Sequence, residues 1–245
     1  MKPSSCSTLP IRTARGGYLF ERLQHRSIED LLVELDGERL RAAHCYFGGG
    51  TAMVMRFGEW RVSSDIDFMV SDWAGYKAIR AQIVERGIGV VGALDPLREV
   101  IADRYGIRTL VTSGTGPIKF EIVHEGRIAF DPPSQGDEVC GITTLSVGDM
   151  VASKLLANDD RWADRALFSR DVIDLAMLPA DAAQWSAGRG KAVGAYGPSV
   201  DKNLDRAVED LLNHSGWLAT CMSELQIGTV TDDDLRARLA DLRAR

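Results

Sequence analysis

The sequence predicts an α+β fold in which a mixed or antiparallel sheet, flanked by helices, precedes a C-terminal helical region. Strand patterns occur between residues 45 and 130, whereas the periodic segments after residue 145 have helical spacing. The chain has 245 residues, 45% of them hydrophobic, and is long enough to bury a real core. The expected organisation is a flexible N-terminus at 1–17, a core at 18–145 and a helical domain at 146–245.

The first elements of the core follow from capping residues and side-chain periodicity. Ser27 is a good N-cap for a first helix whose leucines and isoleucine share one face. A short helix is expected over 51–57, directly after a run of glycines. In the segment 65–70, DIDFMV, apolar residues alternate with Asp65 and Asp67. This period of two predicts a strand that carries both carboxylates on the same side.

The rest of the core is predicted to be one helix and a strand-rich stretch. Residues 73–87 form an amphipathic pattern, and 88–130 is rich in strand formers. The clearest strands are 110–112 and 119–123, with a Gly- and Pro-containing turn between them that favours a hairpin. In the second of these strands Glu121 lies on the face opposite its apolar neighbours.

The C-terminal hundred residues are predicted to be helical. Ser146 is an N-cap with an acidic residue at N3, and Thr231 precedes a helix with acids in its first turn and arginines near its end. Helical patterns cover 147–157, 162–178, 201–225 and 232–243. The glycine-rich stretch Ser186–Pro198 is the expected flexible boundary.

Composition excludes several classes of protein. A net charge of −6 and a pI near 5.3 argue against a broad basic surface that coats nucleic acid, although a local basic groove remains compatible with them. The four cysteines and four histidines are scattered, so neither a zinc site nor a disulfide framework is predicted. No apolar run approaches the ~18 residues of a membrane span, and no secretory signal is evident, so a cytoplasmic protein without membrane association is expected.

The segment GGGTAMVMRFGEWRVSSDIDFMV, residues 48–70, combines features of a metal and phosphate site. Glycines let backbone amides approach a triphosphate closely, and two carboxylates two residues apart on a strand can bind a divalent cation. Oxygen ligands next to phosphate favour magnesium, as one or two ions, with Mn²⁺ as a substitute. Chance alone would give about two D-x-D pairs in this chain. The context of the first pair distinguishes it from Asp232/Asp234, whose acids suit a helix N-terminus.

Two stretches in this order resemble the AbiEii/AbiGii nucleotidyltransferase toxin family of the DNA polymerase β superfamily. The first is a GG-T-A start that leads to an R-x-S-x-DIDF strand, and its matching residues are Gly49, Gly50, Thr51, Arg61, Ser63, Asp65 and Asp67. The second, KLLANDDRWADRALFSRDVIDLAML, resembles the family's later lysine and R-D-x-x-D motif through Lys154, Arg170, Asp171 and Asp174. Many superfamily members have Gly-Ser in place of Gly49-Gly50, so a hydroxyl contact to phosphate would come from Thr51 or be missing.

The resemblance implies a polymerase β-like core and a set of site residues. Asp65 and Asp67 would bind metal, Glu121 is the candidate third carboxylate, and Lys154 would neutralise phosphate charge. Asp171 would orient either Lys154 or the acceptor hydroxyl. The nucleotide would be bound by Gly49, Gly50, Thr51, Arg61, Ser63, Lys154 and Asp174.

Simpler interpretations remain open for some of these residues. Glu121 could form an ion pair with Lys119 or a neighbour on the sheet. Arg170, Asp171 and Asp174 could form surface ion pairs along one helix.

The resemblance also implies an activity: transfer of a nucleoside monophosphate from a nucleoside triphosphate to an acceptor hydroxyl. For this family the expected acceptor is the 3′ end of tRNA, and the expected role is the toxin of a toxin–antitoxin or phage-exclusion pair with a cognate antitoxin. Two alternatives stay open. The acceptor could be a protein or small molecule, or the chain could be a regulatory module that binds nucleotide without turnover.

Overall fold

The computed structural model describes residues 18–245, and the predicted flexible segment 1–17 lies outside the described residues. The class is α+β, as predicted. The strands are β1 (Tyr46–Gly48), β2 (Ile66–Val70), β3 (Ile101–Ala102), β4 (Gly106–Val111), β5 (Ile118–His124), β6 (Glu138–Val139) and β7 (Ile142–Thr143). The helices are α1 (Leu23–Leu32), α2 (Gly37–Ala42), α3 (Gly49–Phe57), α4 (Trp73–Arg86), α5 (Val147–Arg161), α6 (Arg170–Met177), α7 (Ala182–Tyr196), α8 (Ser199–Asn213), α9 (Trp217–Glu224) and α10 (Asp232–Ala244).

The central sheet is mixed, and its register aligns the predicted site residues. Its five strands run in the order β1-β2-β5-β4-β3, with β2 parallel to β5 and the other neighbours antiparallel. Asp67 on β2 lies opposite Gly48 on β1 and opposite Glu121 on β5. Arg108 on β4 continues the row beyond Glu121. The row therefore crosses four adjacent strands.

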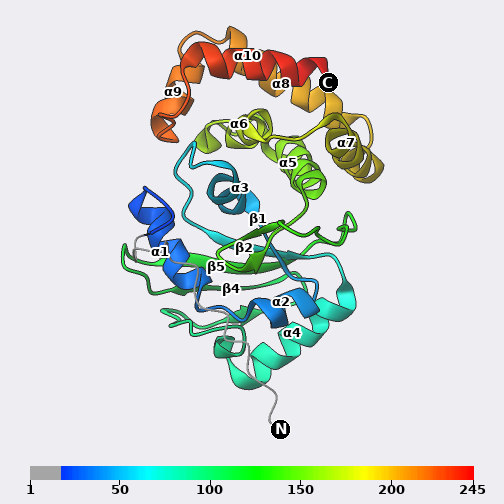
Figure 1. The fold of residues 1–245 in the computed structure, drawn as a ribbon. Helices are drawn as coiled ribbons and strands as arrows, with labels where there is room; N and C mark the ends of the chain where they lie inside the picture. The colour runs from blue at the N-terminus through cyan, green and yellow to red at the C-terminus, as the bar shows by residue number, and fades with distance from the viewer. Residues whose placement is uncertain (1–17) are drawn as a thin grey trace.

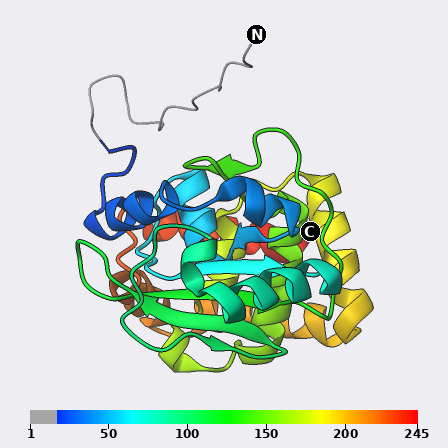
Figure 2. The same ribbon diagram turned by 90° about the horizontal axis from the view of Figure 1, so that it is seen from below.

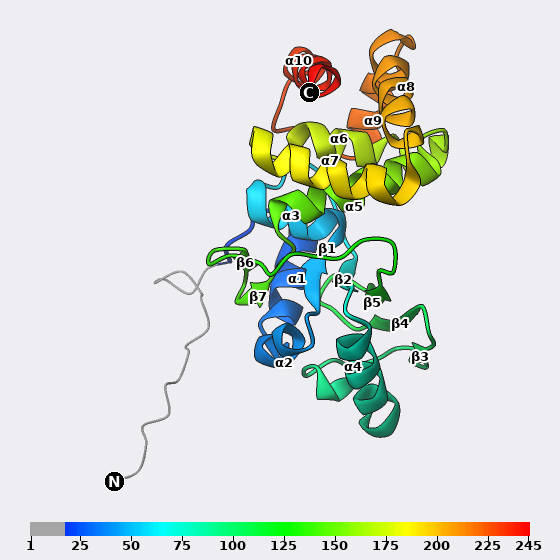
Figure 3. The same ribbon diagram turned by 90° about the vertical axis from the view of Figure 1, so that its right-hand side faces the viewer.

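Helices cover both faces of the sheet. In Figure 1, α3, α5 and α6 lie above the sheet, and α2 and α4 lie below it. The view from below shows α4 running across the lower face (Figure 2). Helices α8 and α10 lie beyond α5 and α6 as a further layer, and α7 packs beside α5 (Figure 3). α5 contacts α6, α7 and α8, so it joins the sheet-proximal helices to the C-terminal ones.

The hydrophobic core explains the alternation predicted for β2. Ile66, Phe68 and Val70 are fully buried, and Asp67 points to the opposite face. The ring of Phe68 lies 5.5 Å from that of Phe47 and 5.8 Å from that of Phe120. Aromatic packing between neighbouring strands therefore fixes which side of β2 faces the core and which side carries the carboxylate.

Several other predicted elements are confirmed. The 51–57 helix is α3, the 73–87 helix is α4, and the predicted hairpin is the antiparallel pair β4–β5. Ser146 caps α5 through the Asp149 amide, and Thr231 forms a capping box at the start of α10.

Three local predictions are wrong. α1 begins at Leu23, so Ser27 lies inside the helix and does not cap it. The helix start is fixed by tertiary contacts instead, because the Arg22 amide donates to Glu59 Oε1 at 3.1 Å. The predicted 162–178 helix is interrupted by left-handed backbone at Phe168 and Ser169, and α6 starts only at Arg170. The predicted 201–225 helix is divided into α8 and α9 by a turn at Gly216.

The glycine-rich stretch Ser186–Pro198, predicted as a flexible boundary, lies almost wholly within the regular helix α7. Its glycines include Gly188, where a Cβ would lie 2.8 Å from Val151 Cβ on α5. Gly188 therefore permits close packing of α7 against α5.

Candidate functional site

Three carboxylates gather where β2 and β5 run side by side. Asp65 immediately precedes β2, and Asp67 on β2 is the register partner of Glu121 on β5. Burial and the negative charges of Asp65 and Glu121 raise the pKa of Asp67 to about 6, against the opposing effect of nearby Lys119 and Lys154. A cation bound here would relieve the repulsion between these carboxylates.

The glycine pair lets the N-terminus of α3 lie against this centre. Gly49 has a φ of +66°, and a Cβ on it would lie 2.6 Å from Asp67 Oδ2. A Cβ on Gly50 would overlap the guanidinium of Arg61. α3 follows Gly48 without a side-chain cap, so the helix N-terminus presents backbone N–H donors and the positive end of its dipole. This is the arrangement by which helices bind phosphate.

The two predicted hydroxyl residues bind each other. Thr51 is fully buried, and its Oγ1 lies 2.8 Å from Ser63 Oγ. The Ser63 amide donates to Nε2 of His25 at 3.3 Å, and Nδ1 of His25 lies 2.7 Å from Glu59 Oε1. Burial lowers the pKa of His25 despite its Glu59 partner. Because Nε2 accepts the Ser63 amide proton, this hydrogen bond requires the neutral imidazole with its proton on Nδ1.

The second sequence motif forms a buried ion-pair network. Lys154 on α5 extends its Nζ to 2.8 Å from Asp171 Oδ1 and 2.7 Å from Asp174 Oδ2, both on α6. Arg161 Nε binds the other oxygen of Asp171 at 2.7 Å. Lys154, Asp171 and Asp174 are each no more than 5% exposed. These residues therefore do not form surface pairs along one helix, which was the simpler interpretation of the motif.

Arg61 joins the first motif to the second. Its Nε and Nη2 bind the two oxygens of Asp174, each at 2.7 Å, and its Nη1 donates to the Val62 carbonyl at 2.8 Å. The Trp60 indole donates to Asp174 Oδ1 at 3.3 Å. Burial alone would raise the pKa of Asp174, but Arg61 and Lys154 outweigh burial and lower it. Asp174 is therefore an ionised carboxylate surrounded by donors.

Charged residues of the two sequence motifs also interact at longer range. The charge of Lys154 acts on Asp67, and the charge of Arg61 is affected by Asp65 as well as by Asp174. The predicted site residues thus converge from the β1–α3 junction, β2, β5, α5 and α6. His25 and Glu59 join them through Ser63, and nothing in their sequence spacing indicated this.

The carboxylate centre is suited in part to a divalent cation. Its ligands would be carboxylate oxygens, which Mg²⁺ prefers, and Asp67 is held among like charges. Glu121 instead binds Lys119, with its Oε2 2.6 Å from the lysine Nζ, and Arg108 Nε lies 3.8 Å from its Oε1. Within residues 18–245 no three acidic, histidine or cysteine side chains already have a metal-binding arrangement. Asp65 and Asp67 therefore fit the ion, whereas Glu121 would first have to leave Lys119.

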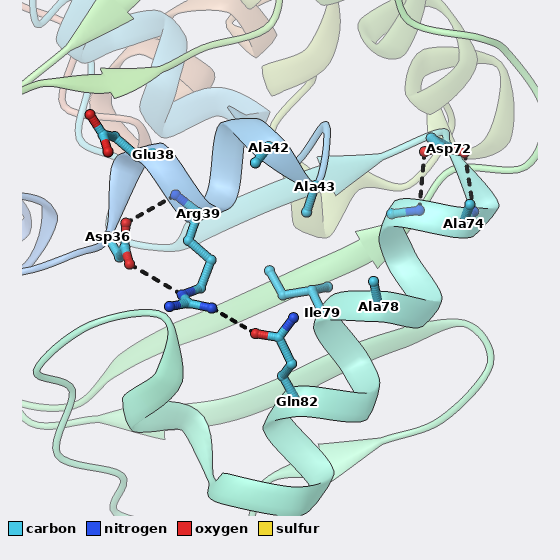
Figure 4. Close-up of a pocket in the computed structure, with 11 residues that line it drawn as sticks. Asp36, Glu38, Arg39, Ala42, Ala43, Asp72, Ala74, Ala78, Ile79 and Gln82 are labelled. Atoms are coloured by element: carbon cyan, nitrogen blue, oxygen red, sulfur yellow. Dashed lines mark hydrogen bonds and ion pairs between the residues drawn. The ribbon is translucent and has the colours of Figure 1, made fainter.

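A separate cavity of about 620 Å³ lies between α2 and α4. Figure 4 shows Arg39 of α2 reaching both Asp36 and Gln82 across it, with small side chains such as Ala43 and Ala78 along its walls. None of the predicted site residues lines this cavity. The chemistry expected from the sequence is therefore located elsewhere, on the other face of the sheet.

In residues 18–245 no helix combines the length and apolar composition that a membrane span requires.

Solved structures resemble the fold over most of the chain. A candidate nucleotidyltransferase from H. pylori has 17% identity and a TM-score of 0.53, covering 91% of this chain and 96% of its own. JHP933 from Helicobacter pylori has 18% identity and a TM-score of 0.52, covering 91% and 93%. MenT4, a nucleotidyltransferase toxin from Mycobacterium tuberculosis, has 15% identity and a TM-score of 0.43, covering 91% and 85%. No curated protein matches the chain by sequence.

These distant structures show only the fold, and a family profile shows which family the chain belongs to. The profile of the nucleotidyl transferase AbiEii toxin, from type IV toxin–antitoxin systems, matches residues 30–242. This range includes both motifs and nearly all of the C-terminal helices. The chain therefore belongs to the AbiEii family of nucleotidyltransferase toxins.

Proposed function

We propose that this nucleotidyltransferase moves a nucleoside monophosphate from a nucleoside triphosphate to the 3′ end of a tRNA, in a reaction that depends on divalent metal. The acceptor hydroxyl oxygen would form a bond to the α-phosphorus, and the bond to the β-phosphate oxygen would break, so that pyrophosphate leaves. The observation that carries the proposal is the convergence of a carboxylate pair, an uncapped glycine helix N-terminus and a buried lysine.

The β1–α3 junction is the proposed triphosphate-binding element. The Gly49 and Gly50 amides would donate to phosphate oxygens at the helix N-terminus, beside Asp67. Thr51 and Ser63, bound to each other, would fix the loop that leads into β2. Arg61 and Asp174 are buried against each other, which supports a role in positioning Gly50 and α3 around the nucleotide.

Asp65 and Asp67 would hold the metal, Mg²⁺ or Mn²⁺, and Glu121 would complete the set. When bound, such ions would neutralise triphosphate charge and favour ionisation of the acceptor hydroxyl. The raised pKa of Asp67 supports this assignment, because cation binding would stabilise the charge that burial disfavours.

Lys154 is the proposed cation opposite the phosphates. It is pinned by Asp171 and Asp174, so it would need no reorganisation to oppose the negative charge that develops as pyrophosphate leaves. Asp171 binds Lys154 and Arg161 simultaneously. Both oxygens of Asp171 are thereby occupied. This supports a role for Asp171 in orienting Lys154 and not in contacting the acceptor hydroxyl.

The family supports the remaining parts of the proposal. A type IV toxin implies a cognate antitoxin. The tRNA acceptor is the one expected from the family resemblance of the two sequence motifs. A tRNA substrate would place the reaction in the cytoplasm.

The test is label transfer from each of four α-labelled nucleoside triphosphates to total tRNA with Mg²⁺. The active-site variant is Asp65→Asn/Asp67→Asn, and the matched control is Asp232→Asn/Asp234→Asn, which removes the same charges from the start of α10. Label on tRNA that disappears only in the active-site variant is the expected result. Label that reaches lysate proteins but not tRNA would refute the acceptor, and nucleotide binding without any transfer would refute turnover.

A further inference from the structure

The carboxylate centre already contains a cation supplied by the chain. Lys119 and Glu121 are two residues apart on β5 and therefore share a face of the sheet. The Lys119 Nζ lies 2.6 Å from Glu121 Oε2, a charge-assisted hydrogen bond. Asp67 and Asp65 also attract this ammonium. The positive charge of this one lysine thus acts on all three carboxylates predicted to bind metal.

Arg108, the other cation close to Glu121, is bound mainly to another carboxylate. Arg108 Nε lies 3.8 Å from Glu121 Oε1, but its Nη1 donates to Asp103 Oδ2 at 3.2 Å. Lys119 therefore makes the shorter contact with Glu121. Its side chain is 47% exposed, whereas that of Glu121 is 17% exposed. The lysine reaches the centre from the solvent side, so it can withdraw without disturbing the core.

We propose that Lys119 is a positioning residue that holds Glu121 away from the metal centre until a divalent cation displaces the ammonium. This inference rests on the proposed metal dependence. Metal loading then exchanges one ion pair for another at Glu121, and the affinity for the first ion is reduced by the strength of the Lys119–Glu121 pair. The absence of a preformed three-ligand arrangement in residues 18–245 agrees with this exchange.

The experiment measures Mn²⁺ binding from the EPR signal of the free ion, without nucleotide. Four proteins form a double-mutant cycle: wild type, Lys119→Met, Glu121→Gln and the double variant. Lys202→Met is the control, because it removes the same charge from the exposed surface of α8. Loss of a partly exposed, hydrogen-bonded ion pair should tighten Mn²⁺ binding about fivefold in Lys119→Met. Most of the gain should be lost in the Glu121→Gln background, where Lys119 acts only through its attraction to Asp65 and Asp67. Lys202→Met should bind as wild type does.

The other outcomes overturn the inference in distinguishable ways. Equal affinity in wild type and Lys119→Met, or a gain of undiminished size in the Glu121→Gln background, would show that Lys119 does not act through Glu121, and the metal-dependent function would stand. No Mn²⁺ binding by either protein would refute metal dependence and the inference with it. Thermal unfolding in EDTA confirms that each variant is folded before the comparison is made.

Discussion

Replacing Asp67 by Asn should stabilise the metal-free protein while it abolishes transfer. Asp67 has an ordinary pKa of 3.8, and burial, together with the negative charges of Asp65 and Glu121, raises this to about 6 in the folded protein. The folded state therefore binds the proton more tightly than the unfolded state does. As pH rises from 3.8 towards 6, stability falls, and above this range the loss is constant. A shift of about two pKa units corresponds to about 3 kcal/mol.

The asparagine has the same shape and does not titrate, so its advantage should depend on pH. The free energy of unfolding of Asp67→Asn should exceed that of wild type by about 3 kcal/mol at pH 7.5 and by about 1 kcal/mol at pH 4.5. Urea denaturation in EDTA at both pH values gives these differences. Added Mg²⁺ should stabilise wild type and reduce the difference, because the cation binds only the folded carboxylate centre.

Asp233→Asn is the charge-matched control, since Asp233 is exposed in the first turn of α10. It should change stability by less than about 1 kcal/mol at either pH, with a small loss from the helix dipole. Equal stability of Asp67→Asn and wild type at pH 7.5 would refute the reasoning. So would a gain of the same size at both pH values, because the raised pKa would then not be its source.

The remaining predictions concern the neighbouring contacts. Gly50→Ala should cost about 3 kcal/mol or more in urea denaturation, because its methyl group would overlap Arg61 and break a buried ion pair; an unchanged midpoint would contradict this. Lys154→Met should cost about 1.5–3 kcal/mol, measured in the same way, and should abolish label transfer, since Asp171 and Asp174 each lose a buried charge-assisted hydrogen bond but keep their arginine partners. Ser63→Ala should cost about 1 kcal/mol in thermal unfolding by removing the partner of a buried hydroxyl, and retention of full stability would argue against that hydrogen bond.

Local patterns predicted the parts of the fold that depend on local contacts. The alternation in β2, the β4–β5 hairpin and the caps of α5 and α10 each follow from residues close together in the chain. The parallel pairing of β2 with β5 does not follow from local residues, because 47 residues lie between the two strands and no turn fixes their register. The predicted cap at Ser27 was wrong for a related reason, because Glu59, far along the chain, determines where α1 begins.

The site divides in the same way. The closeness of Asp65 to Asp67 was predictable because Asp67 lies on β2 and Asp65 immediately precedes it. Lys154 and Asp174 could be named together because one family motif contains both. The bond between Arg61 and Asp174 joins residues 113 positions apart, so no spacing could indicate it. The sequence left two interpretations of Glu121 open, as a metal ligand or as the partner of Lys119. In the structure Glu121 forms the ion pair with Lys119. That pair does not exclude metal binding, because a cation that competes with an ammonium uses the same oxygens.

The buried pair of Arg61 and Asp174 explains why the two motifs belong to one unit. Two charges removed from water lose much of their solvation, and their attraction offsets this loss only in good geometry, so such a pair adds little net stability. Without Asp174, Arg61 would be an unpaired charge in the core, at a cost of about 3–5 kcal/mol. The loop before β2 and helix α6 can therefore occupy their positions only together. Because Asp174 also binds Lys154, the constraint that places Arg61 places the lysine near Asp67 as well. The network thus contributes precise placement of charge around the proposed phosphate site more than it contributes stability.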